Sequence, residues 1–201
     1  MGEKNYTTPG LSIIDDMTSE ELQGLVDIMQ KNGRGICSLS ERTSYGEGEA
    51  AEAAYRNEVK KVFRKYGSHT LGFVLNSYVD ILRKVCEKME ISNVKNTSME
   101  RMEQELLKQV MDQTWARMTE EQKAAVLASG EPSMNYKKAA GFAVATLAGR
   151  WIGLLTGPVG IGLTALYTIW GFGGAAYRVV IPATIYIAAI RQVHQAGGKN
   201  A

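Results

Sequence analysis

Twenty-seven consecutive residues, from Trp151 to Tyr177, carry no charged side chain, and this run constrains the fold more than any other feature of the chain. A helix that is apolar on every side must be buried all round, either by protein or by lipid. Small residues recur at every fourth position before the run and into it, at Gly141, Ala145, Gly149, Gly153 and Gly157. Steps of four stay on one face of a helix, so these residues predict a ridge that lets a second helix approach closely.

A helical hairpin is predicted at the end of this ridge. Its turn consists of Gly157, Pro158 and Gly160. Glycine commonly ends a helix, and proline is favoured at the first position of the next one. The predicted hairpin is therefore glycine-rich and apolar, with a first arm over residues 139–156.

The residues before Pro132 predict amphipathic helices instead. Capping boxes, in which a Ser or Thr and a Glu or Gln three residues later cap the same helix start, occur at Thr18, Thr97 and Thr119. Apolar residues then recur with the helical period. The predicted helices cover residues 18–32, 49–66, 69–90, 97–115, 119–130 and, after the hairpin, 179–191, which begins or bends at Pro182.

These patterns predict an all-α multi-helix bundle, in which amphipathic N-terminal helices surround the C-terminal hairpin. Charge divides the chain into two regions that can form one continuous domain. Residues 1–131 carry 17 basic and 21 acidic side chains, whereas residues 132–201 carry six basic and no acidic ones. The total of +2 is too small to indicate a nucleic-acid partner.

No catalytic, metal or cofactor site is predicted. The two histidines, His69 and His194, form no metal-ligand spacing with other side chains. The two cysteines, Cys37 and Cys86, fit no metal or redox spacing and are interpreted as inert thiols in a reducing compartment. The glycines of the hairpin turn are not followed by the Lys-Ser/Thr pair of a phosphate-binding loop. We therefore expect a protein that is not an enzyme.

Burial of the hairpin in protein and its insertion into a membrane both remain open. A spanning helix needs about 20 apolar residues, and the first arm has 18 positions, including Arg150. A charge near the centre of a span costs about 2.5–3.5 kcal/mol on insertion scales. The side chains predicted to contact lipid or a partner are Lys137, Lys138, Arg150, Trp151, Trp170, Tyr177, Arg178 and Arg191.

Arg178 has a second interpretation, in which it caps helix carbonyls or pairs with a carboxylate of the acidic region. Glu103, Glu105 and Asp112 are the candidate partners for such an ion pair.

Two parts of the chain are similar to the bacterial YaaW family. The first runs from Ser98 to Lys123 and includes Met118-Thr-Glu-Glu-Gln-Lys123. The second includes Leu155-Thr-Gly-Pro-Val-Gly-Ile-Gly162 and the residues from Gly174 to Arg191. That family is grouped with ubiquinol–cytochrome c chaperones, which are helical assembly factors for a respiratory membrane complex. The resemblance implies an all-helical, non-enzymatic protein that works beside a membrane.

Together these features favour a membrane-associated assembly or chaperone-like factor that binds an apolar helix or the bilayer through residues 139–190. A pore-forming protein and a soluble helical interaction module are the two alternatives. The N-terminus has no apolar run after a basic patch, so no secretory signal is predicted. We expect a cytoplasmic location with peripheral or conditional contact with the inner membrane, and a homo-oligomer is compatible with the ridge.

Overall fold

The computed structural model describes residues 10–33, 39–69, 77–92, 94, 96–117, 119–121, 123 and 177–197. Its main helices are α1 (Ile13–Asp16), α2 (Ser19–Asn32), the 3-10 helix η1 (Arg42–Tyr45), α3 (Glu49–His69), α4 (Tyr78–Lys88), α5 (Met99–Arg117) and α9 (Tyr177–Gly197). The described residues contain no strand, which confirms the predicted all-α multi-helix fold. The predicted hairpin and its ridge lie outside the described residues.

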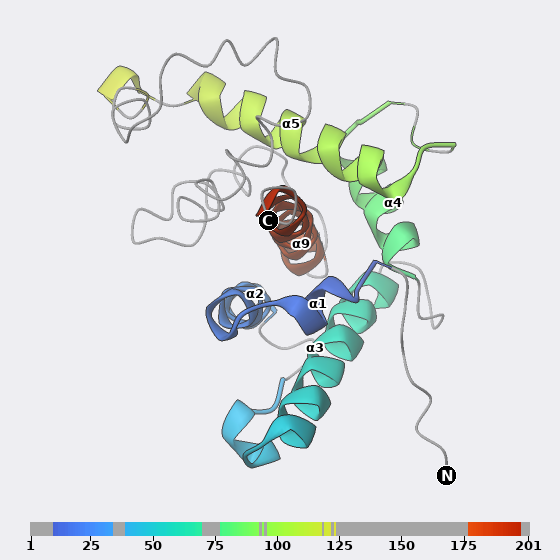
Figure 1. Cartoon of the computed structure of the whole chain (residues 1–201). Helices are drawn as coiled ribbons and strands as arrows, with labels where there is room; N and C mark the ends of the chain where they lie inside the picture. The colour runs from blue at the N-terminus through green and yellow to red at the C-terminus, as the bar shows by residue number, and fades with distance from the viewer. Residues whose placement is uncertain are drawn as a thin grey trace.

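Helix α9 lies at the centre of the bundle (Figure 1). Helices α1, α2, α3, α4 and α5 all contact it. Every residue from Val179 to Gln192 is buried. Burial on all sides is what a helix without a polar face requires. The neighbouring amphipathic helices supply their apolar faces to the same core, which includes Leu25, Phe63 and Leu106.

Local signals in the sequence set several helix ends. At the start of α2, the Glu21 amide donates to the Thr18 hydroxyl oxygen at 3.2 Å, and the Thr18 amide donates to the Glu21 carboxylate at 2.7 Å. This is the predicted capping box, and α2 ends at Asn32 as expected. Helix α5 begins at Met99, and its cap is Ser98 and not the predicted Thr97, because the Ser98 hydroxyl oxygen accepts a hydrogen bond from the Arg101 amide.

The boundary between α3 and α4 differs from the prediction. Helix α3 does not stop at Gly67 but continues to His69. An added Cβ at Gly67 would lie 2.5 Å from Cδ1 of Ile81, so this glycine allows α4 to approach closely. Helix α4 begins at Tyr78, after a capping box in which Ser77 and Asp80 exchange hydrogen bonds at 3.2 Å. A single helix over residues 69–90 was therefore the wrong prediction.

Helix α9 also begins earlier than predicted. It starts at Tyr177 and includes Pro182 within its second turn. Proline lacks the amide that would continue the hydrogen-bond ladder, but the other bonds and the burial of the helix remain. None of the helices in the described part of the chain has the length and apolar character needed to cross a membrane.

Helix α2 runs antiparallel to α9. The Tyr186 hydroxyl donates to the carbonyl of Glu21 at 3.0 Å. Nε2 of His194 lies 3.1 Å from the carboxylate of the same Glu21. The start of α2 therefore lies beside the later half of α9, and the end of α2 lies near the start of α9.

Substitution of Gly24 tests this contact. An added Cβ would lie 2.5 Å from the hydroxyl oxygen of Tyr186. Alanine replacing glycine in an exposed helix stabilises by about 0.8–1.0 kcal/mol. We instead expect Gly24→Ala to lower the free energy of unfolding in urea by about 1–3 kcal/mol, as overpacking does. The further change Tyr186→Phe removes the clashing oxygen and should restore part of this loss. A stabilised Gly24→Ala variant would contradict the observed packing of α2 on α9.

Candidate functional site

Most of the predicted site residues lie outside the described part of the chain. They are the predicted lipid or partner contacts Lys137, Lys138, Arg150, Trp151 and Trp170, the ridge residues Gly141, Ala145, Gly149, Gly153 and Gly157, and the turn residues Pro158 and Gly160. The structure describes three of the predicted residues, namely Tyr177, Arg178 and Arg191, and all three belong to α9.

Arg191 lies in the interior of the bundle and not at the surface where a lipid contact was expected. Only 8% of this residue is exposed. Its Nε lies 3.1 Å from each carboxylate oxygen of Glu103, and its Nη2 donates to the carbonyl of Gly10. A buried arginine is stable only when its donors are paired, and these two partners satisfy that need. In this structure Arg191 therefore holds helices together and does not reach a lipid surface.

Glu103 and Tyr78 complete this buried network. Glu103 is fully buried, and its Oε1 accepts a hydrogen bond of 2.6 Å from the Tyr78 hydroxyl. Burial raises the pKa of Glu103, while the Arg191 guanidinium opposes that rise. The pKa of Tyr78 is also raised well above its ordinary value, first by burial and then by the Glu103 charge. The Arg191 guanidinium carbon lies 5.7 Å from the centre of the Tyr78 ring.

This network joins four parts of the chain that are distant in sequence. Gly10 precedes α1, Tyr78 begins α4, Glu103 belongs to the first turns of α5, and Arg191 belongs to α9. Although Nε of Arg191 lies 3.1 Å from Oε2 of Glu103, that oxygen has no hydrogen bond of good geometry in the described structure. The groups of this network are paired with one another and not aimed at an open cavity, which indicates a structural role. We call the network of Gly10, Tyr78, Glu103 and Arg191 the clamp.

The other two predicted residues begin α9, and the first of them, Tyr177, is half-buried against the core. Nζ of Lys88, the last residue of α4, lies 5.6 Å from the centre of the Tyr177 ring. This distance lies within the range of a cation–π interaction. Arg178 is exposed to solvent. Glu103, one of its candidate partners, pairs with Arg191 instead.

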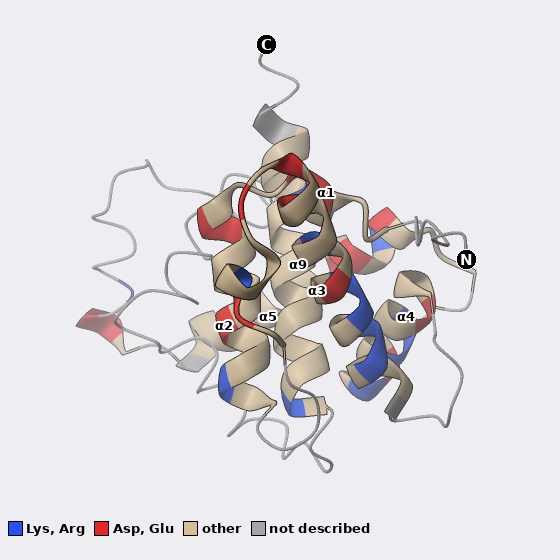
Figure 2. Cartoon of the chain, turned by 90° about the horizontal axis from the view of Figure 1, so that it is seen from below, with Lys and Arg blue, Asp and Glu red and all other residues tan. Residues whose placement is uncertain are grey.

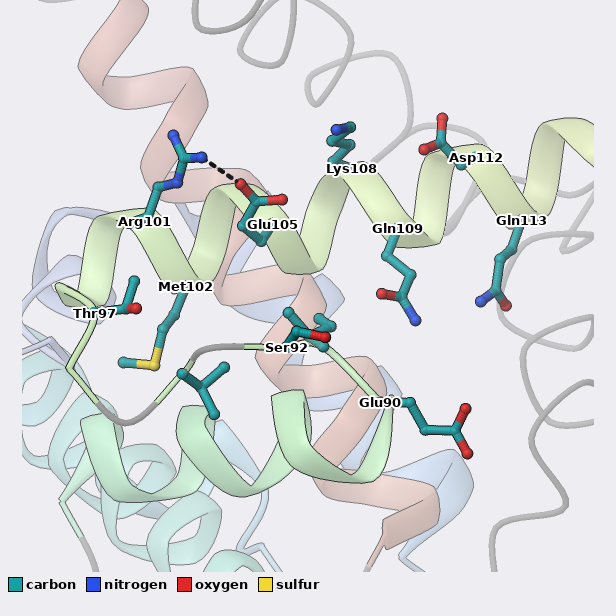
Figure 3. A pocket seen from close by; sticks show the side chains of 12 residues that line it. Glu90, Ser92, Thr97, Arg101, Met102, Glu105, Lys108, Gln109, Asp112 and Gln113 are labelled. Carbon is teal, nitrogen blue, oxygen red and sulfur yellow. Dashed lines mark ion pairs between the residues drawn. The ribbon is translucent and has the colours of Figure 1, made fainter.

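A surface pocket of about 620 Å³ lies between α5 and the segment after α4 (Figure 3). Its charged side chains have both signs: Arg101 and Glu105 form an ion pair of 2.7 Å, and Lys108 and Asp112 lie farther along α5. Nε2 of Gln109 donates to the Met89 carbonyl at 2.5 Å and fastens α5 to the end of α4. The lining contains neither histidine nor cysteine.

A second pocket, of about 830 Å³, lies beside η1 and the start of α3. Glu52 at its edge pairs with both Arg42, at 2.7 Å, and Arg56, at 2.8 Å. The lining carries three glutamates and two arginines, so this hollow presents charges of both signs.

The described structure places the Cys86 thiol in the core and His194 beside the start of α2. Burial raises the pKa of the Cys86 thiol to about 12, so that it stays protonated at neutral pH. Nε2 of His194 lies 3.1 Å from the carboxylate of Glu21, and this carboxylate also caps α2. Within the described residues, no group of three or more His, Cys, Asp or Glu side chains could hold a metal ion.

Sequence reasoning missed the central role of Glu103. It lies between Met102 and Leu106 on the buried side of α5. A carboxylate within an apolar helical stripe is a signal for a buried partner, and an arginine inside the apolar α9 sequence is its complement. The sequence could have suggested an ion pair between Glu103 and an arginine of α9. It did not distinguish Arg191 from Arg178 as the partner.

The chain is similar over most of its length to a UPF0174 protein of Helicobacter pylori (strain J99 / ATCC 700824). The two are 24% identical over 230 aligned positions, which cover 90% of this chain and 90% of the relative. No family model matches the chain. No solved structure matches it either. The similarity indicates a relationship to a bacterial family whose name states no activity.

Removal of Arg191 tests the clamp. We expect Arg191→Met to lower the free energy of unfolding by about 3–5 kcal/mol, because it leaves the Glu103 carboxylate buried without a cation. The double variant Arg191→Met/Glu103→Gln should recover much of that loss, because glutamine is uncharged and still accepts a bond from Tyr78.

The matched control is Arg101→Met, which removes the exposed ion pair with Glu105 and should cost less than about 1 kcal/mol. Equal losses for the variants at positions 101 and 191, measured in urea, would show that the buried pair does not hold the bundle together.

Proposed function

We propose that this protein is a non-enzymatic, membrane-associated assembly or chaperone-like factor. In this proposal it binds an apolar helix or the bilayer through its charge-free run. We also propose that the protein is related to the YaaW family, which is remotely grouped with respiratory-complex chaperones. Its proposed location is the cytoplasmic face of the inner membrane.

One observation carries the proposal. Tyr177 is both the last residue of the charge-free run and the first residue of α9. From Val179 onward α9 is buried, and the Arg191–Glu103 pair fixes its later half. An unusually apolar segment is thus covalently joined to the most firmly held helix of the bundle. Such an attachment suits a segment that engages a partner while the bundle stays folded.

The described structure narrows the part of the chain available for this contact. Residues 139–190 were expected to form the contact surface, but residues 179–190 are already covered by the protein's own helices. The proposal therefore assigns partner contact to residues 139–176. In that range, the small residues at Gly149, Gly153 and Gly157 would allow close packing against an apolar helix.

Vesicle flotation tests this proposal, and the substitution Gly153→Leu tests the ridge. We expect the wild-type protein to float with vesicles and to resist extraction by alkaline carbonate. Leucine at position 153 should prevent close helix approach and abolish binding to a partner helix, while circular dichroism shows the fold retained. Ala143→Leu adds bulk in the same segment but lies on the opposite side of the predicted helix from the four-residue row, and it should bind like the wild type.

The other results separate the rival functions. Release of a trapped dye on binding would favour a pore-forming protein over a chaperone-like factor. A protein that remains at the bottom of the gradient with every vesicle, and that loses global stability on Gly153→Leu, would contradict the proposal and favour a soluble interaction module.

A further inference from the structure

Basic side chains, all exposed except the half-buried Lys84, gather at the end of the bundle where α9 begins. Helix α4 runs antiparallel to α9, because Tyr78 at its start lies against Arg191 and Lys88 at its end lies against Tyr177. Helix α2 is also antiparallel to α9, which directs Lys31 in its last turn toward the same end.

Helix α3 brings a further lysine to this end. The hydroxyl of Tyr66 donates to the carbonyl of Gly33, directly after α2, at 3.2 Å. Lys65 therefore lies close to the level at which α2 ends, and it is exposed. We call this group of side chains the basic end, and it consists of Lys31, Lys65, Lys84, Lys88 and Arg178. The acidic side chains nearest to it on α4 and the following turn are Glu87 and Glu90.

The opposite end of the bundle is acidic. Asp15, Asp16 and Glu20 lie in α1 and the first turn of α2, and all three are exposed. The contact of Glu21 with Tyr186 and His194 places this region beside the later half of α9. Figure 2 shows the resulting separation: Lys and Arg colour the ends of helices away from the C-terminus, and Asp and Glu are concentrated nearer to it. The molecule therefore has a charge polarity along α9.

We propose that the basic end binds the surface of an anionic phospholipid bilayer. The inference deepens the proposed function, on which it rests for the choice of partner, by naming the lipid class and the docking face. Lysine ammonium groups attract anionic headgroups, and their long apolar stems allow them to follow an uneven surface. Tyr177, held under Lys88, has the amphipathic ring that is favoured at the level of the headgroups.

A bilayer fits this end better than a nucleic acid does. The 26 residues before Tyr177 carry no charge. Such an apolar run makes no favourable contact with the hydrated phosphates of a nucleic acid. A bilayer offers both an anionic surface for the lysines and an apolar interior for that run. The positive charge and the junction with the apolar run occur at the same end of the molecule, and this coincidence carries the inference.

Flotation of the full-length protein with two kinds of vesicle tests the inference. One kind contains phosphatidylcholine alone, and the other also contains phosphatidylglycerol. We expect preferential binding to the phosphatidylglycerol vesicles at low salt. Lys84→Gln/Lys88→Gln should weaken this binding by about 25-fold, since each lysine near an anionic surface contributes about a 5-fold change.

The matched control is Arg42→Gln/Arg101→Gln, which lowers the net charge equally. Arg42 and Arg101 lie outside the basic end, and both are exposed. This variant should bind like the wild type. Urea unfolding of both variants shows whether each remains folded.

The outcomes distinguish this inference from the proposed function. Equal binding by the two variants, or equal binding to both kinds of vesicle, would overturn the lipid-docking role of the basic end and leave apolar engagement by residues 139–176 standing. Binding that needs Lys84 and Lys88 but disappears entirely at high salt would uphold the basic end and contradict apolar engagement. Absence of binding to any vesicle would overturn the lipid-docking role of the basic end and engagement of the bilayer by residues 139–176, and would leave an apolar helix as the partner of the proposed function.

Discussion

The ion pair between Arg191 and Glu103 constrains the rest of this bundle, because two charges removed from water are stable only when they remain together. The pair fixes the position of α9 along its own axis relative to α5. Through the hydrogen bond from Tyr78 to Glu103, it also fixes that position relative to α4. The bond from Arg191 to Gly10 adds the segment before α1. Apolar contacts alone would tolerate sliding of α9, since one Ile or Ala resembles the next. The charged network selects one position.

Once α9 has that position, the charge distribution of the molecule follows. Helices α2 and α4 pack antiparallel to α9, and each ends near Tyr177. Their last turns carry Lys31 and Lys88, whose positive charges are favourable near the negative end of a helix dipole, and Lys84 lies one turn before Lys88. Acidic residues that favour helix starts, such as Glu20, then lie at the other end. Ordinary helix-end preferences, combined with one packing direction, thus produce a molecule with a basic end and an acidic end.

The sequence predicted features that depend on neighbouring residues. The capping box at Thr18 and the helical period of α2 were read correctly because both involve contacts within a single helix. The stop assigned to Gly67 was wrong, since its smallness serves the contact with Ile81, a residue 14 positions away. The helix start at Ser77 was missed because apolar periodicity on both sides concealed it.

The candidate site was harder to predict for the same reason. A lone arginine in an apolar sequence has the same local pattern whether it reaches lipid or a buried carboxylate. Only the packing of α5 on α9 distinguishes Arg191 from Arg178, of which the first is buried and the second exposed. The basic end could not be predicted as a group either. Lys31, Lys84 and Arg178 belong to three different helices, and only the packing of these helices brings them to the same end of the bundle.

Native-state hydrogen exchange tests most directly whether α9 is the fixed centre of the bundle. The buried amides between Ala183 and Ile190 should exchange only through global unfolding, with the same free energy and urea dependence as the most protected amides of α2 and α5. Exchange of these α9 amides at a distinctly lower free energy, while α2 and α5 stay protected, would show that α9 leaves the folded bundle and would contradict the account.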